Sequence, residues 1–200
     1  MDMKVTEIIR DMDECVRLLI EEKQIVAIFQ GKGEWGPRAL GNRSILFDPT
    51  NLRAKQIVNE VKKREEYRPF AGSVMLEHAH EYFEMLQLKE SPWMSFAIQG
   101  KPLAYEKIPS IVHADGTCRI QTVTEEQNKN YYNLIKKMYE TNGVPVVFNT
   151  SFNLGGEALV ETIYDAIDTC NRSDINFLYV PEDQDIHIPY DAIKLKELTK

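Results

Sequence analysis

Hydrophobic residues follow two patterns that alternate along the chain: a helical spacing of three to four residues, and short continuous runs typical of buried strands. Apolar residues recur every three to four positions after Thr6, a candidate N-cap, and this stripe predicts a helix to about Lys23. Short apolar runs predict strands at residues 25–29, 44–47, 72–75, 144–148 and 175–180. Helical patterns also cover residues 48–63, 76–83, 125–141 and 162–171. This alternation predicts an α/β (α+β) fold in which helices pack on a mixed β-sheet.

The pattern is weaker in the middle of the chain. Residues 93–98 are interpreted as a strand, and Pro102 and Pro109 predict loops after it. An Asp-Gly pair then gives the clearest hairpin signal, because it favours a tight primed turn between the apolar runs 110–113 and 118–123.

The stretch from Gly31 to Ser44 directly follows the first predicted strand and has the composition of a rigid ligand-binding loop. Its fourteen residues include four glycines, one proline and two arginines. Glycine lets a backbone turn sharply or approach a ligand, and arginine offers a planar fork of donors for phosphate or carboxylate. Arg38 is the better candidate donor, whereas Arg43 is expected to brace the loop. A structural turn with surface arginines is the alternative.

Two familiar nucleotide-binding signatures do not explain this loop. Residues 31–36 spell GxGxxG, but a dinucleotide-binding turn requires a helix to begin at once, and Pro37 and Gly41 interrupt any helix. A phosphate P-loop is also excluded. Gly36 and Gly41 have the required spacing, but Gly41 is followed by Asn-Arg and not by Lys-Ser or Lys-Thr. We therefore expect an anion site of another kind at the end of a strand.

A second basic cluster, residues 62–70, ends a predicted helix. Lys62 lies one turn after Val58 and is expected to point inward, and Arg64 and Arg68 follow it. A solvated helix face is the ordinary interpretation of such a charge run. The aromatic-proline turn that fixes Arg68 weakens that interpretation, so the cluster is a second candidate for anion binding.

Two further segments place polar side chains next to predicted strands. His113 and Arg119 lie on the arms of the predicted hairpin, and a metal site through His113 and Asp115 lacks a third ligand at a recognisable spacing. The most apolar strand is followed by a predicted polar loop at residues 149–157, which carries three polar residues at alternate positions: Asn149, Ser151 and Asn153. Capping explains any one of them, but on an extended edge all three would face the same way.

Composition narrows the classes of protein to which the chain can belong. Its 200 residues, with 43% hydrophobic and 28% charged content, fit one globular domain with a core at about residues 6–180 and a tail at 181–200. The formal net charge of -7 disfavours nucleic-acid binding. The three widely spaced cysteines indicate free thiols in a reducing compartment. No apolar run approaches the roughly 20 residues of a membrane span, so we expect a cytoplasmic protein without membrane or disulfide-linked partners.

Four segments, in this order, resemble the C-terminal domain of the O-carbamoyltransferase family (NodU/CmcH type) that modifies nodulation factors and antibiotics. The matching segments are Glu34–Ile45, Val61–Glu65 with Arg68–Ala71, His113–Val123 and Asn149–Asn153. The resemblance implies a fold similar to the YrdC/Sua5 type, a twisted mixed sheet around a positively charged cavity. It also implies that residues 1–200 are a single C-terminal domain, with the Kae1-like N-terminal transferase domain absent.

The resemblance further implies that the chain binds ATP and carbamoyl phosphate and forms carbamoyl-adenylate. A separate Kae1-like transferase subunit would then pass the carbamoyl group to an acceptor hydroxyl. By this resemblance, Lys62 and Arg68 are catalytic. The residues expected to bind substrate are Arg38, Arg64, Arg119, Asn149, Ser151 and Asn153. Mg²⁺ is expected to arrive with ATP, held by phosphates and water, with no metal ligand assigned to the protein.

Two other functions stay open on the sequence. One is a threonylcarbamoyl-adenylate synthase that acts on threonine and bicarbonate. The other is a non-catalytic module that binds a nucleotide or RNA in the same positive cavity, although the negative net charge gives RNA less weight.

Overall fold

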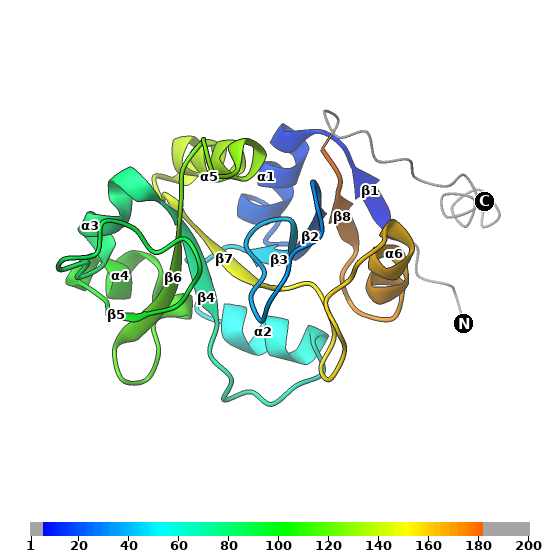
Figure 1. The fold of residues 1–200 in the computed structure, drawn as a ribbon. Helices are drawn as coiled ribbons and strands as arrows, with labels where there is room; N and C mark the ends of the chain where they lie inside the picture. Colours follow the sequence, from blue (N-terminus) through cyan, green and yellow to red (C-terminus); the bar gives the residue numbers. More distant parts are fainter. Residues whose placement is uncertain (1–5, 182–200) are drawn as a thin grey trace.

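The computed structural model describes residues 6–181, which build one eight-stranded sheet with helices packed on both faces (Figure 1). In their order across the sheet, the strands are β1 (Glu7–Ile9), β8 (Phe177–Tyr179), β2 (Val26–Phe29), β3 (Arg43–Phe47), β7 (Val146–Ser151), β4 (Ala71–Met75), β6 (Thr117–Val123) and β5 (Ala97–Gln99). The helices are α1 (Met12–Ile20), α2 (Ala54–Val61), α3 (Ala79–Tyr82), α4 (Pro102–Lys107), α5 (Lys129–Asn142) and α6 (Ile163–Asn171), with 3₁₀ turns at Leu76–His78 and Pro109–Ile111.

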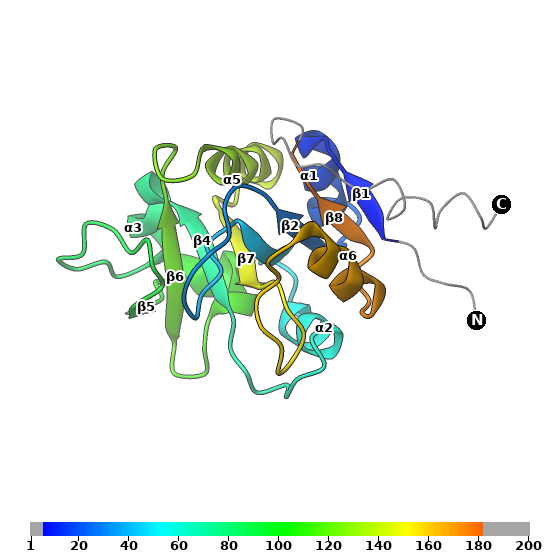
Figure 2. The ribbon, with the colours of Figure 1, turned by 45° about the vertical axis from the view of Figure 1, so that its right-hand side comes forward.

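The sheet is mixed, as the sequence predicts. β8 runs parallel to both β1 and β2, and β4 runs parallel to β6. β3 and β7 are antiparallel to their neighbours, and β5 is antiparallel to β6. Helices α1 and α5 lie on one side of the sheet and α2 on the other in both views (Figure 1 and Figure 2). The α/β fold with helices on a mixed sheet is therefore confirmed.

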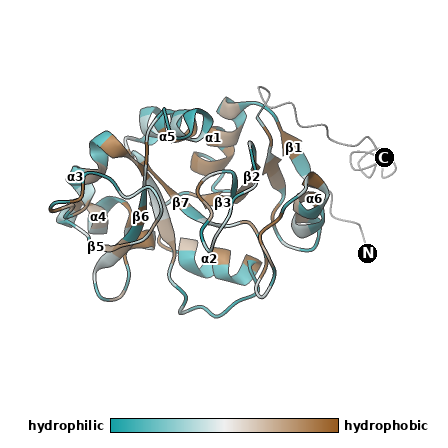
Figure 3. Cartoon of the chain, viewed as in Figure 1, coloured by the Kyte–Doolittle hydropathy of each residue, from teal (hydrophilic) through white to brown (hydrophobic). Residues whose placement is uncertain are grey.

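Alternation along the strands divides the core into two clusters, one on each face of the sheet. Val26 and Ile28 pack in the cluster that contains α1 and α5, whereas Ala27 and Phe29 pack in the cluster that contains α2 and α6. Helices α2 and α5 carry both hydrophilic and hydrophobic residues (Figure 3), as expected of helices with one buried stripe. Burial on both faces explains why the central strands read as continuous apolar runs.

Local signals fix two helix ends as predicted. Thr162 begins α6 with a capping box: its hydroxyl accepts the Asp165 N–H at 3.2 Å, and the Asp165 carboxylate accepts the Thr162 N–H at 2.8 Å. Gly143 ends α5 in the left-handed conformation, with φ of 74°. These ends are set by side-chain chemistry within a few residues, which is why the sequence predicts them.

The predicted N-terminal helix begins too early. Residues Glu7–Ile9 form the edge strand β1, paired with β8, and Thr6 is not a cap. Asp11 caps α1 instead, accepting the Asp13 N–H at 3.2 Å. The apolar stripe that predicted one helix spans a strand and a helix, because pairing with a strand at the far end of the chain overrides the local period.

The start of the helix predicted at residues 48–63 is also wrong. Asp48 makes a local turn, in which its carboxylate accepts the Thr50 N–H at 2.9 Å and the Lys23 ammonium at 2.6 Å. Helix α2 therefore begins only at Ala54.

The predicted hairpin is wrong as well. Pro109–Ile111 form a 3₁₀ turn, and the Asp-Gly turn only closes His113 against Thr117, with a 2.8 Å bond from the His113 N–H to the Thr117 carbonyl. Strand β6 pairs with β4 and β5 instead. Pro102 and Pro109 begin helical turns and not loops, as proline does at a first helical position.

The polar segment predicted as a loop at residues 149–157 begins as the end of the central strand β7. Asn149 pairs with Leu46 on β3 and with Ala71 on β4, and Ser151 pairs with Ser44 on β3. Backbone ladders therefore hold the polar side chains of β7 in a rigid array. The tail predicted from residue 181 lies outside the described residues, apart from Pro181 itself.

Candidate functional site

Predicted site residues meet on the face of the sheet that carries α1 and α5. Ala71 on β4 lies in register with Arg119 on β6 and with Asn149 on β7, so the three side chains form one row across the sheet. Ser151, two positions further along β7, projects from the same face. A cavity of about 130 Å³, here named the basic pocket, is lined by Pro37, Arg38, Ala39, Arg64, Pro69, Phe70, Ala71, Met94, Arg119, Asn149, Thr150 and Ser151.

The basic pocket gathers positive charge from three segments of the chain. Arg38, Arg64 and Arg119 line it, and its lining residues include no carboxylate. Burial, and then the charge of Arg119, lower the pKa of Arg38. Burial, and then the charge of Arg68, lower the pKa of Arg64 to about 10. Converging cations without a compensating acid are the electrostatic arrangement of an anion site.

The Arg64 guanidinium is held by contacts at Nε and over its planar face, whereas its Nη2 is unpaired. Its Nε donates to Asn59 Oδ1 at 2.6 Å, and its guanidinium carbon lies 4.3 Å from the centroid of the Phe70 ring. Its Nη2 is buried and has no hydrogen-bond partner in the described part of the chain. A buried donor left open in this way is available to an oxygen of a ligand.

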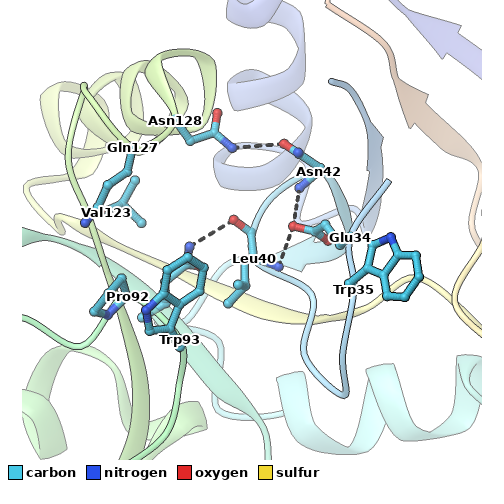
Figure 4. Close-up of a pocket in the computed structure, with 10 residues that line it drawn as sticks. Glu34, Trp35, Leu40, Asn42, Pro92, Trp93, Val123, Gln127 and Asn128 are labelled. Carbon is cyan, nitrogen blue, oxygen red and sulfur yellow. Dashed lines mark hydrogen bonds between the residues drawn. The ribbon is translucent and has the colours of Figure 1, made fainter. Parts of the chain in front are cut away.

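The glycine-rich loop is held in shape by its own glutamate. The Glu34 carboxylate accepts the backbone N–H groups of Leu40 at 2.8 Å, Asn42 at 3.1 Å and Arg43 at 3.0 Å, and Figure 4 shows the first two of these contacts. Burial of this carboxylate raises its pKa. The loop thus closes around an internal anion and carries Arg38 to the mouth of the basic pocket.

Arg43 braces the loop, as the sequence predicts. It is 3% exposed, its Nη1 donates to the Gln30 carbonyl at 2.6 Å, and its guanidinium lies 3.6 Å from the centroid of the Phe29 ring. The two arginines of the loop therefore have different surroundings. Arg43 is part of the core, whereas Arg38 lines the pocket.

Lys62 lies beneath the basic pocket and is 1% exposed, which confirms the inward direction predicted for it. Its ammonium donates to the Ser151 carbonyl at 2.5 Å, the Asn153 carbonyl at 2.8 Å and Asn153 Oδ1 at 2.9 Å. These three bonds use all the hydrogens of an ammonium group. Lys62 therefore braces the end of β7, and its catalytic role stays a prediction.

Replacing Lys62 with methionine is expected to lower the free energy of unfolding by about 2–4 kcal/mol, because it orphans buried oxygens of Ser151 and Asn153. Urea unfolding at pH 7 measures the loss. Lys63→Met is the matched control, since its ammonium makes one exposed bond, to the Arg172 carbonyl at 3.1 Å. Equal stabilities of the two variants would contradict a bracing role.

The same variant has a predicted pH signature. Burial, and then the charge of Arg64, lower the pKa of Lys62 from 10.5 to about 7. Between these two pH values the unfolded state binds more protons than the folded state, so this group makes the free energy of unfolding rise with pH. The stability advantage of the natural chain over Lys62→Met should therefore grow from pH 7 to pH 10, and a constant difference would contradict the assignment.

Arg68 and Asn153 are not among the lining residues of the basic pocket. Arg68 pairs with Glu65 at 2.7 Å and its side chain is 51% exposed. It lines a neighbouring open cavity of about 590 Å³, to which Arg64 also belongs. Asn153 Oδ1 accepts from Lys62 and from the Ser151 hydroxyl at 2.7 Å. The predicted roles of Arg68 in catalysis and of Asn153 in substrate binding stay predictions.

A second cavity, of about 360 Å³ and here named the amide pocket, lies at the start of α5 (Figure 4). It is lined by Glu34, Trp35, Leu40, Asn42, Pro92, Trp93, Gln121, Val123, Gln127 and Asn128. A cavity of about 340 Å³ between the two pockets shares Arg38 and Arg119 with the basic pocket, and Trp35 and Trp93 with the amide pocket. Arginines and flat aromatic surfaces thus border one groove.

The amide pocket is not predicted from the sequence. Trp93 belongs to the segment with the weakest pattern, and the pattern around Gln127 and Asn128 indicates only a helix. Trp93 is 66% exposed although it is a large apolar residue. A tryptophan in a segment without a core pattern is the one signal that could have indicated this cavity.

Other chemistry considered from the sequence finds no site in the described residues. No group of three or more His, Cys, Asp or Glu residues there could hold a metal ion. The ring of His113 instead contacts the Phe70 carbonyl, with Nε2 at 3.1 Å. Cys15, Cys118 and Cys170 are buried thiols that form no disulfide. No described helix combines the length and the apolar character needed to cross a membrane.

The family to which the chain belongs follows from its sequence. The sequence profile described as "Carbamoyltransferase C-terminus" matches residues 17–184. This match contains all four segments that carry the predicted resemblance. The chain belongs to the carbamoyltransferase C-terminal domain family.

Two relatives similar to this chain are longer proteins. Nodulation protein NolNO of Sinorhizobium fredii is 41% identical over 163 residues, which cover 80% of this chain and 24% of that protein. The 3'-hydroxymethylcephem-O-carbamoyltransferase of Amycolatopsis lactamdurans is 32% identical over 157 residues, which cover 78% of this chain and 29% of that protein. The chain therefore spans 24% and 29% of the lengths of these two relatives.

Solved structures agree with the fold predicted from the resemblance. The full-length HypF structure in its phosphate- and nucleotide-bound form superposes with a TM-score of 0.60 at 20% identity, over 89% of this chain and 26% of that chain. Sua5 of P. abyssi, complexed with L-threonine, superposes with a TM-score of 0.58 at 14% identity, over 88% of this chain and 49% of that chain. The domain has the YrdC/Sua5-like fold.

Proposed function

We propose that this chain binds ATP and carbamoyl phosphate and forms carbamoyl-adenylate, which a Kae1-like transferase domain or chain uses to carbamoylate a hydroxyl. The observation that carries the proposal is the basic pocket, where Arg38, Arg64 and Arg119 converge without a carboxylate in the lining. Both substrates are polyanions, and family membership favours the carbamoyl group as the group transferred. The proposed location is the cytoplasm.

The groove favours one orientation of ATP. Phosphates would lie against the three arginines, and the base would reach the amide pocket, where Trp93 supplies a flat apolar face. Figure 4 shows Trp93 at the wall of that cavity, near Leu40. The shared cavity between the two pockets would take the ribose.

The proposed chemistry has two balanced steps. In the first step water attacks the phosphorus of carbamoyl phosphate, the bond from phosphorus to the carbamoyl oxygen breaks, and carbamate leaves with the electron pair while orthophosphate forms and a proton passes to solvent. A carbamate oxygen then attacks the α-phosphorus of ATP, the bond to the β-phosphate oxygen breaks, and pyrophosphate leaves with the electron pair. The second step needs no general base, because carbamate is already an anion. Arg38, Arg64 and Arg119 would stabilise the charge that the phosphoryl oxygens carry in the transition state.

Mg²⁺ is part of the proposal only as a companion of ATP. The lining of the basic pocket offers hydroxyl and amide oxygens, such as those of Ser151 and Asn149, but no carboxylate. This donor set does not fit a Mg²⁺ ion held by the protein, which usually has one or two carboxylate ligands. The ion would then be bound by the phosphates and water.

A substrate comparison separates the proposal from its nearest rival. The fold shared with Sua5 keeps a threonylcarbamoyl-adenylate synthase as the second candidate. In the purified chain without a transferase partner, water hydrolyses the adenylate to AMP and carbamate, so with ATP and Mg²⁺ we expect AMP from carbamoyl phosphate and not from L-threonine and bicarbonate. The reverse result would assign the second function, and tight ATP binding without AMP from either set would assign a non-catalytic nucleotide-binding module.

A further inference from the structure

Two buried polar atoms in the lining of the basic pocket have no hydrogen-bond partner in the described part of the chain. One is a donor, Arg64 Nη2, and the other is an acceptor, Asn149 Oδ1. Buried polar atoms are nearly always paired in folded proteins, so each is a place where a ligand group can bind. A single ligand that satisfies both must carry a hydrogen-bond acceptor for Arg64 and a donor for Asn149, and an anionic oxygen and an N–H group on one small molecule meet these two requirements.

The direction of the Asn149 amide is fixed by its neighbours. Its Nδ2 donates to the Ala39 carbonyl at 3.1 Å and to Ser73 Oγ at 2.9 Å, which uses both amide hydrogens. A flipped amide would place its oxygen against the Ala39 carbonyl, where neither oxygen has a hydrogen to donate. Oδ1 is therefore the free atom of this side chain, which is 1% exposed as a residue.

The Ser73 hydroxyl is fixed in turn. Its hydrogen goes to Gln121 Oε1 at 2.8 Å, because the Gln121 amide nitrogen already donates to the Leu40 carbonyl at 2.9 Å. Ser73 Oγ can then only accept from Asn149 and from the Tyr131 hydroxyl, which lies 2.9 Å away. The hydrogens of the Asn149 amide and of the Ser73 and Tyr131 hydroxyls thus each have an acceptor, whereas Asn149 Oδ1 receives no hydrogen bond from the described residues.

We infer that Asn149 Oδ1 accepts an N–H of the carbamoyl amide, while Arg64 Nη2 donates to an anionic oxygen of the same substrate. This inference rests on the proposed function and makes Asn149 its specificity-determining residue. The three arginines bind any phosphate, since arginine supplies donors only. Asn149 supplies the acceptor that distinguishes carbamoyl phosphate from acetyl phosphate, which has a methyl group in place of the amino group.

The test compares three ligands on the natural chain by isothermal titration calorimetry: carbamoyl phosphate, acetyl phosphate and orthophosphate. Carbamoyl phosphate is expected to bind at least about tenfold more tightly than acetyl phosphate, because the methyl group leaves Oδ1 unpaired. Acetyl phosphate and orthophosphate should bind with similar affinities. Equal affinities for carbamoyl phosphate and acetyl phosphate would overturn the inference without any mutant.

A variant then locates the preference. Asn149→Ala is expected to bind carbamoyl phosphate and acetyl phosphate equally, with orthophosphate affinity within about twofold of the natural chain. Asn51→Ala, outside the pocket lining, is the control and should keep the preference. A folded Asn149→Ala protein that keeps the preference would contradict the role of Oδ1. If Asn149→Ala does not fold, the comparison on the natural chain decides alone.

The inference and the proposed function can fail separately. A tenfold preference for carbamoyl phosphate with no AMP formed would remove the proposed reaction and leave the amide acceptor in place. AMP formed from carbamoyl phosphate without any preference in binding would leave the reaction in place and remove the acceptor.

Discussion

Replacing Arg119 with alanine is expected to lower kcat/KM for carbamoyl-phosphate-dependent AMP release by about 10²–10³-fold, the usual loss when one preorganised donor to transition-state charge is removed. Arg119 lines both the basic pocket and the cavity that leads to the amide pocket. The backbone of Arg119 is held in place because this residue of β6 pairs with Ala71 of β4. Steady-state kinetics of AMP release measure the effect.

The stability of this variant should stay close to that of the natural chain, because the described residues give Arg119 no ion pair to lose. Arg17→Ala is the matched control, since Arg17 on α1 pairs with Glu14 at 2.7 Å, away from the pocket. The kcat/KM of Arg119→Lys should lie between those of Arg119→Ala and Arg17→Ala, because lysine keeps the positive charge of arginine but lacks its planar fork of donors. Full activity in Arg119→Ala, or a collapse of its melting temperature, would remove Arg119 from the binding site.

Replacing Gly41 with alanine is expected to reduce the free energy of unfolding by about 3–5 kcal/mol, which combines left-handed backbone strain with overpacking. Gly41 has φ of 111°, and an added Cβ would lie 2.3 Å from Tyr131 Cδ1. Tyr131, in the first turn of α5, is fully buried and cannot move aside without disturbing its bond to Ser73. Chemical denaturation measures the loss.

A variant at Gly36, in the same loop, distinguishes the cost of backbone strain from the cost of overpacking. It has φ of 104°, but an added Cβ would meet no heavy atom within 4 Å. Gly36→Ala should therefore show only the backbone cost of about 1–2 kcal/mol. Equal losses in the two variants would mean that contact with Tyr131 contributes nothing, and that the loop is not packed against the start of α5.

Elements with signals inside a few residues could be predicted from the sequence. The capping box at Thr162 and the apolar run before the glycine-rich loop are of this kind, and so is the inward direction of Lys62, which follows from its spacing to Val58. The family motifs also identify Arg38, Arg64 and Arg119 as one group of site residues. Arg119 is in that group although the hairpin that was to position it does not exist.

The remaining features depend on contacts between distant segments. Strand β1 exists because it pairs with β8 near the other end of the described chain, and no local period reveals such a partner. The short strand β5 occupies only Ala97–Gln99, the residues that pair with residues 117–119 of β6. The sequence predicts Asn149 in a loop, because its pairing with strands β3 and β4 cannot be seen from the local pattern.

The basic pocket also depends on contacts between distant segments, so the sequence alone does not predict it. Its arginines come from a loop, from the turn after α2 and from β6, so their convergence is a property of the sheet order. The sequence can name them as candidates but cannot say which share a cavity. Arg68 shows the difference, because it lies beside Arg64 in the chain yet lines the neighbouring cavity.

The central claim is that this domain, with its pocket of three arginines, forms carbamoyl-adenylate. The most direct test is the exchange of labelled pyrophosphate into ATP, because exchange reports the reversal of adenylate formation and needs no transferase partner. The folded chain with Mg²⁺ is expected to catalyse exchange that depends on carbamoyl phosphate and is lost in Arg119→Ala. No exchange in a folded sample that binds both substrates would contradict the claim.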